Sequence, residues 1–200
     1  MWLSDIIRLR IKSYIIIDNF FPDEICKQLR ENILNTKVFK KEYFDYKSID
    51  FDNDPPDPSL KDISENYVVP KISLIKQSQY ERGWSFLYNN VGRGVSTHAD
   101  PSFINVNIWV TPDECVEDHN KNGLRIYKKS APKNIPWEYY NSGNHPWTIK
   151  FLKKSKYDRI PYKYNRAIIF RGNTFHSTDN VHMKQGQENR RVNYTFLYKP

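Results

Sequence analysis

The sequence predicts a mainly β protein in which helices pack against a sandwich or barrel. From Trp84 onward, short apolar and β-branched runs alternate with turn residues, as successive strands do. No helical periodicity separates these runs, which disfavours a βαβ arrangement. Aromatic residues make up 15% of the 200 residues, enough to build one core despite the hydrophilic composition. The expected strands are residues 84–88, 102–110, 124–127, 148–152, 166–170 and 191–198.

The N-terminal part predicts a strand and then a helix. Residues 14–17 are apolar and mostly β-branched, which favours a strand. Pro22 and the two acidic residues after it suit a helix N-terminus. Apolar side chains at every fourth position then place one face of a helix, running to about Asn35, against a sheet. We expect a single domain over residues 1–200, in which about 1–80 support a core formed by about 81–200.

The net charge and the two cysteines limit the binding partners and structural sites that the sequence favours. The formal net charge of +8 would suit an anionic partner such as nucleic acid. Because the basic residues are scattered, we interpret them as a solvated surface and keep a nucleic-acid groove as the alternative. Cys26 and Cys115 lie far apart, which predicts neither a disulfide framework nor a zinc site. Without a signal peptide or a long apolar run, we expect a cytoplasmic protein with no membrane partner.

Two segments carry residues that can hold a metal. In His98-Ala99-Asp100, residues two apart on an extended backbone point to the same side, so an imidazole and a carboxylate can bind one ion. His176 follows the apolar strand 166–170 and a Gly-Asn turn. Two histidines and one carboxylate form a face that leaves three coordination positions open, as an oxygenase needs.

The second histidine has a rival. His182 stands in the polar stretch 179–189, whereas His176 comes directly after a strand. We therefore prefer His176 as the ligand and retain His182 as the alternative. His119 and His145 occur in loop-like sequence and are expected at the surface.

The last expected strand alternates with period two. Its polar residues Arg191, Asn193 and Thr195 fall on one face, and its apolar residues fall on the other. If the polar face lines the interior, Arg191 is a buried cation whose planar guanidinium matches a carboxylate. Arg190 competes for this role, but choosing it would turn the apolar stripe toward the site.

In their order along the chain, these motifs resemble the Fe(II)/2-oxoglutarate dioxygenase superfamily, particularly its prolyl-hydroxylase-like branch. The matching features are His98-x-Asp100, then His176, then Arg191 followed by Val-Asn-Tyr-Thr-Phe. Further similarities are Tyr88 ahead of the first histidine, the hairpin 122–127, and the opening Ile-Asp-Asn-Phe-Phe-Pro-Asp-Glu before a helix. Residues of about 30–80 and 133–157 lie outside the resemblance.

The resemblance implies a double-stranded β-helix, a cupin-like jelly-roll with helices packed on one sheet. Iron would be held by His98, Asp100 and His176. The C5 carboxylate of 2-oxoglutarate would pair with Arg191, while the opposite end of the co-substrate chelates the metal. Tyr88 occupies a position from which a phenol often helps to hold that carboxylate, and the family's Arg-x-x-x-Thr pattern adds Thr195. Asn107 could bind cofactor or substrate if its face of the strand 102–110 looks inward; otherwise that face is exposed.

The resemblance also implies an activity. We expect hydroxylation of a substrate by O₂, with 2-oxoglutarate converted to succinate and CO₂; demethylation would follow from the same step. The sequence does not choose among a peptide, a nucleobase, a sugar and a small molecule. The alternative is a non-catalytic jelly-roll that binds an anionic or aromatic ligand. The aromatic-rich segment Lys133 to Tyr157 is either a lid or binding loop, or a plug over one end of the barrel.

Overall fold

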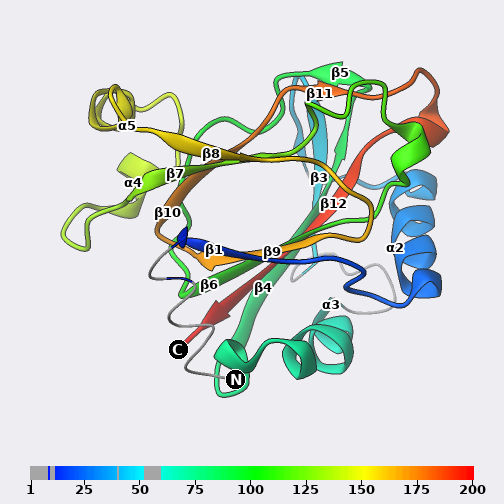
Figure 1. Cartoon of the computed structure of the whole chain (residues 1–200), viewed down its shortest axis with the longest axis horizontal. Helices are drawn as coiled ribbons and strands as arrows, with labels where there is room; N and C mark the ends of the chain where they lie inside the picture. Colours follow the sequence, from blue (N-terminus) through cyan, green and yellow to red (C-terminus); the bar gives the residue numbers. More distant parts are fainter. Residues whose placement is uncertain (1–8, 10–11, 40, 52–59) are drawn as a thin grey trace.

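The computed structural model describes residues 9, 12–39, 41–51 and 60–200 and shows two facing layers of antiparallel strands (Figure 1). The large layer is a seven-stranded sheet. In spatial order it contains β1 (Tyr14–Ile17), β9 (Ala167–Arg171), β6 (Ile104–Trp109), β12 (Val192–Lys199), β4 (Gln79–Tyr88), β3 (Tyr46–Asp50) and β2 (Lys41–Glu42). The facing layer contains β10 (Thr174–Thr178), β7 (Leu124–Ser130) and β8 (Tyr157–Ile160), with the separate pair β11 (Val181–His182) and β5 (Val91–Gly92). The prediction of a mainly β fold is confirmed.

One face of the large sheet packs against helices. The apolar residues of β12 join a buried cluster with α2 (Asp23–Asn35) and α3 (Leu60–Ile63). Tyr194 donates a hydrogen bond from its hydroxyl to the Leu29 carbonyl oxygen at 2.8 Å. Because side chains alternate across a strand, the polar residues of β12 and of β6 point to the other side, between the two layers. This settles the orientation on which the interpretation of Arg191 and Asn107 depended.

Helix α2 confirms the prediction of a helix that ends at Asn35. Asp23 and Glu24 occupy its first turn, where acidic side chains oppose the helix dipole. Leu29 and Ile33 are buried against the sheet. The other helical turns are η1 (Ser64–Val68), η2 (Val69–Lys71), η3 (Ser73–Ile75), η4 (Asp113–Cys115) and η5 (Gln187–Asn189). Among the described helices, none has the length and apolar character that a membrane span requires.

The expected strand at residues 148–152 is wrong, because this stretch is the helix α5 (Pro146–Leu152). Proline suits the first helical position, and the His145 side chain accepts a hydrogen bond from the Trp147 backbone N at 3.2 Å. Trp147 and Phe151, four residues apart, stack with ring centroids 4.7 Å apart on one helical face. The helix-initiating residues His145 and Pro146, and the packing of Trp147 on Phe151, therefore outweigh the strand propensity of this stretch. A second short helix, α4 (Trp137–Tyr140), precedes α5.

Candidate metal and cofactor site

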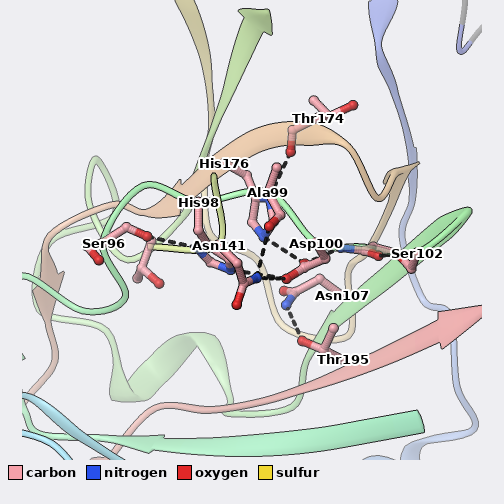
Figure 2. Close-up of polar contacts among 12 residues, drawn as sticks. Ser96, His98, Ala99, Asp100, Ser102, Asn107, Asn141, Thr174, His176 and Thr195 are labelled. Carbon is pink, nitrogen blue, oxygen red and sulfur yellow. Dashed lines mark hydrogen bonds and ion pairs between the residues drawn. The ribbon is translucent and has the colours of Figure 1, made fainter. Parts of the chain in front are cut away.

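His98, Asp100 and His176 converge between the two layers, with their side chains turned toward one another (Figure 2). One potential ligand atom from each lies within 4.8 Å of the others. His98 and His176 form an isolated antiparallel bridge, in which the backbone N of each donates to the carbonyl oxygen of the other at 2.9 and 2.8 Å. The Asp100 backbone N donates to the Gly172 carbonyl oxygen at 2.8 Å. The positions of all three side chains are thus fixed by main-chain hydrogen bonds.

Both imidazoles are oriented by a hydrogen bond at Nδ1. His98 Nδ1 lies 2.8 Å from the Ser96 carbonyl oxygen, and His176 Nδ1 lies 3.0 Å from that of Thr174. A carbonyl oxygen only accepts, so each Nδ1 carries a proton, and in the neutral form of the ring the lone pair is then on Nε2. The Nε2 atoms face the Asp100 carboxylate at 3.7 Å for His98 and 3.5 Å for His176. This tautomer is the one in which a histidine binds a metal through Nε2.

Burial also keeps His176 in the form that binds metal. Desolvation, helped by the neighbouring His98, lowers the pKa of His176 to about 4. The imidazole is therefore neutral near pH 7, and no proton has to leave before it can act as a ligand.

Asp100 is 3% exposed, and its carboxylate is held by two amide side chains. Asn105 donates from Nδ2 to Asp100 Oδ2 at 2.6 Å, and Asn141 donates from Nδ2 to Oδ1 at 3.2 Å. Neither asparagine was predicted as a partner of Asp100. The alternation of β6 places Asn105 on the same side as Asn107, whereas no pattern marks Asn141, which follows α4.

Arg191 is a buried cation in which two of the three guanidinium nitrogens lack hydrogen-bond partners among the described residues. It is 1% exposed, and its Nε and Nη1 have no hydrogen-bond partner among the described residues. The guanidinium lies over the rings of Tyr88, Trp109 and Tyr162, with its carbon 4.5, 5.6 and 5.7 Å from their centroids. Aromatic faces stabilise a cation but leave its N–H groups without a hydrogen-bond acceptor. Buried N–H groups in proteins are nearly always hydrogen-bonded. The site therefore suits an anionic ligand.

The two alternative residues, Arg190 and His182, lie outside the pocket that contains Arg191. Arg190 donates from Nε to the Tyr88 carbonyl oxygen at 2.8 Å and from Nη2 to Asn89 Oδ1 at 3.2 Å, so its guanidinium binds the end of β4. The backbone N of His182 donates to Asn122 Oδ1 at 2.6 Å in β11. Neither residue lines the pocket that contains Arg191.

The remaining predicted residues line that same inner pocket with Arg191, His98 and His176. Tyr88 Oη lies 3.1 Å from Thr178 Oγ1. Asn107 donates from Nδ2 to Thr195 Oγ1 at 2.9 Å, and its Oδ1 has no hydrogen-bond partner among the described residues. The structure thus brings together every side chain that the sequence placed at the metal or the co-substrate.

A second, outer pocket of about 530 Å³ shares His98 with the inner pocket and is also lined by Asp100. Aromatic side chains form much of its wall: Tyr43, Tyr46, Trp84, Phe86 and Trp137. Trp137 and Asn141 come from the segment 133–157, which therefore contributes directly to the wall of this pocket. His98 therefore lies where the two pockets meet.

No model of a known protein family matches the sequence, and no curated protein matches it. Solved structures do. A prolyl hydroxylase from Trichoplax adhaerens, in complex with a hypoxia inducible factor peptide, matches with a TM-score of 0.62 and 15% identity, over 97% of this chain and 86% of that one. HygX from Streptomyces hygroscopicus, with nickel and 2-oxoglutarate bound, matches with a TM-score of 0.69 and 7% identity, over 98% and 86%. The epimerase SnoN from nogalamycin biosynthesis matches with a TM-score of 0.68 and 12% identity, over 99% and 82%.

These neighbours are non-heme, 2-oxoglutarate-dependent oxygenase-type structures. At such low identities the likeness establishes the fold. The chain shares the double-stranded β-helix fold of these structures, and the predicted jelly-roll is confirmed.

Proposed function

We propose that this chain is an Fe(II)- and 2-oxoglutarate-dependent oxygenase that hydroxylates its substrate with O₂ and releases succinate and CO₂. His98, Asp100 and His176 would hold the metal, and Arg191 would bind the distal carboxylate of 2-oxoglutarate. The observation that carries the proposal is the buried Arg191 in the pocket that both histidines also line. Two of its guanidinium nitrogens have no hydrogen-bond partner among the described residues. A metal-ligand cluster and an anion receptor in one pocket match the two ends of this co-substrate.

The residues present fit both groups. Two imidazoles and one carboxylate are the donor set of non-heme Fe(II) oxygenases and leave three positions for other ligands. The guanidinium offers N–H donors to a carboxylate, and two of its nitrogens lack partners among the described residues. A non-catalytic binding module would require neither the metal ligands nor their Nδ1 hydrogen bonds, so the intact set favours catalysis.

The chain's own part in the reaction is to bind, orient and exclude water. Bound iron and co-substrate supply the oxidising chemistry. Arg191 would fix the far end of the co-substrate, with Tyr88, Asn107 and Thr195 as the polar groups nearby. The aromatic rings around the guanidinium keep water from competing for its N–H groups. Asn105 and Asn141 hold the Asp100 carboxylate toward the imidazoles.

The outer pocket is the proposed substrate site, because its wall includes His98 and Asp100. Its aromatic lining suits a substrate with a ring or another flat surface that can stack. The neighbours show how widely bound ligands vary on this fold, since one was solved with a peptide and another, HygX, with hygromycin B.

Anaerobic titration tests the proposal. Adding Fe(II) and 2-oxoglutarate to the folded protein should produce the weak visible charge-transfer band of a chelated 2-oxoacid, and admitting O₂ should yield succinate. Omitting either component should leave no band. If the folded protein shows no band at saturating concentrations, the proposal is wrong and a binding module becomes the better account.

A further inference from the structure

The segment 133–157 contacts Ala99, the residue between the proposed metal ligands His98 and Asp100. The Ala99 backbone N donates to the Tyr140 carbonyl oxygen at 2.9 Å, and Asn141 Nδ2 donates to the Ala99 carbonyl oxygen at 2.9 Å. Gly143 allows this close approach, since a Cβ there would lie 2.5 Å from the Thr97 carbonyl oxygen. The end of α4 is therefore docked against the turn that carries His98 and Asp100.

The same amide group reaches the carboxylate itself (Figure 2). Asp100 Oδ1 accepts from Asn141 at 3.2 Å, and Oδ2 accepts from Asn105 at 2.6 Å. Each oxygen thus has one amide donor, and the two donors come from different elements. Asn105 belongs to the central strand β6, whereas Asn141 caps the C-terminus of α4.

Two donors on opposite oxygens restrict rotation of the carboxylate about its Cβ–Cγ bond. Rotation would break at least one of the two bonds and leave a buried oxygen unsatisfied, which costs about 1–3 kcal/mol. With Asn105 alone, Oδ1 would have no side-chain amide donor and the carboxylate could turn about the remaining bond. Asn141 therefore supplies the second constraint on the orientation of Asp100.

We propose that Asn141 is a positioning residue of the metal centre, which makes the segment 133–157 a structural part of that centre. This inference rests on the proposed function, because it assigns Asn141 a role through Asp100 as a metal ligand. Residues that hydrogen-bond to metal ligands typically change metal affinity by about 10–100-fold when removed. The class of ligand concerned is a divalent transition-metal ion.

Co(II) is the probe, since its visible absorption reports the coordination geometry without turnover. Titration of Asn141→Ala with Co(II), in the absence of 2-oxoglutarate, should give a dissociation constant about 10–100-fold higher than that of the wild type. The absorption of the bound Co(II) should also change in shape. Asn141→Ser, with a shorter side chain, should behave in the same way and serves if the alanine variant does not fold.

Asn173→Ala is the matched control. Asn173 also ties a loop to a backbone carbonyl through its side-chain amide, donating from Nδ2 to the Ala131 carbonyl oxygen at 3.3 Å. Its Co(II) affinity and spectrum should equal those of the wild type. Unchanged affinity and spectrum in a folded Asn141 variant would show that this amide only anchors the segment to Ala99. Wild-type protein that binds no Co(II) would instead overturn the proposed function itself.

Discussion

His98 and His176 are joined through their backbones, each N donating to the other's carbonyl oxygen at 2.9 and 2.8 Å. Their ring centroids lie 4.3 Å apart. The bridge fixes the spacing of the two imidazoles independently of any metal, and the Nδ1 hydrogen bonds fix their orientation. Metal binding should therefore require little rearrangement.

A metal that binds this prepared site should stabilise the folded state. At a free metal concentration 100 times the dissociation constant, the gain is about 2.7 kcal/mol if the unfolded chain does not bind. Thermal unfolding with and without Mn(II), followed by removal with a chelator, measures it. Asp100→Ala should lose most of the effect. An unfolding temperature that is the same with and without bound metal would contradict this prediction.

Asp100→Ala should abolish 2-oxoglutarate turnover. The substitution removes the only carboxylate of the cluster and leaves two imidazoles, a set that binds Fe(II) weakly and without charge compensation. Succinate formation under saturating Fe(II) and 2-oxoglutarate is the measurement. Asp118→Ala, which removes an acid at the surface beside Lys121, should retain activity. A fully active Asp100→Ala variant would exclude Asp100 as a ligand.

Arg191→Ala should weaken 2-oxoglutarate binding by about 30-fold or more, because losing one partner of a buried, hydrogen-bonded charge pair costs about 2 kcal/mol or more. The analogue 2-oxopentanoate has a methyl group in place of the C5 carboxylate, so the variant should bind it as the wild type does. Competition against the charge-transfer band gives both affinities.

Arg190→Ala is the control for this pair of ligands, since Arg190 bonds to the Tyr88 carbonyl oxygen instead of the pocket. It should leave both affinities unchanged. Equal losses for 2-oxoglutarate and 2-oxopentanoate in Arg191→Ala would mean that the arginine supports the pocket without binding the carboxylate.

Asp18 should contribute stability that disappears in acid. Hydrogen bonds from Arg166, with a smaller contribution from Lys163, lower the pKa of Asp18 to about 2 from an ordinary value of 3.8. Because the folded-state pKa is the lower one, the stabilisation is fully present above about pH 4 and is lost as the pH falls through 2. Urea unfolding of wild type and Asp18→Asn should differ most above pH 4 and converge near pH 2. A difference that is constant over this range would exclude the ion pair as its cause.

Much of the site could be predicted from local pattern. The spacing of His98 and Asp100 is a property of an extended backbone, and the alternation over residues 191–198 separates Arg191 from Arg190. Both features depend only on neighbouring residues, so one sequence reveals them. The resemblance to the superfamily added the order in which these motifs recur.

Other features depend on contacts between distant segments, which a pattern does not contain. Asn141 meets Asp100 only because α4 docks on Ala99, and nothing near Asn141 signals this. Residues 148–152 have apolar and β-branched character, yet Pro146 and the His145 cap begin a helix there. In both cases tertiary packing or capping outweighed the propensity of the local sequence.

The pocket around Arg191 links two properties that are usually measured separately. Two nitrogens of a buried guanidinium that lack hydrogen-bond acceptors raise the free energy of the empty protein. A bound carboxylate that accepts hydrogen bonds from them removes that penalty. Replacing Arg191 by a neutral residue of similar shape, such as methionine, should therefore make the empty protein harder to unfold while reducing its hold on the co-substrate. The affinity of the pocket for a carboxylate and the reduced stability of the empty protein thus have the same cause.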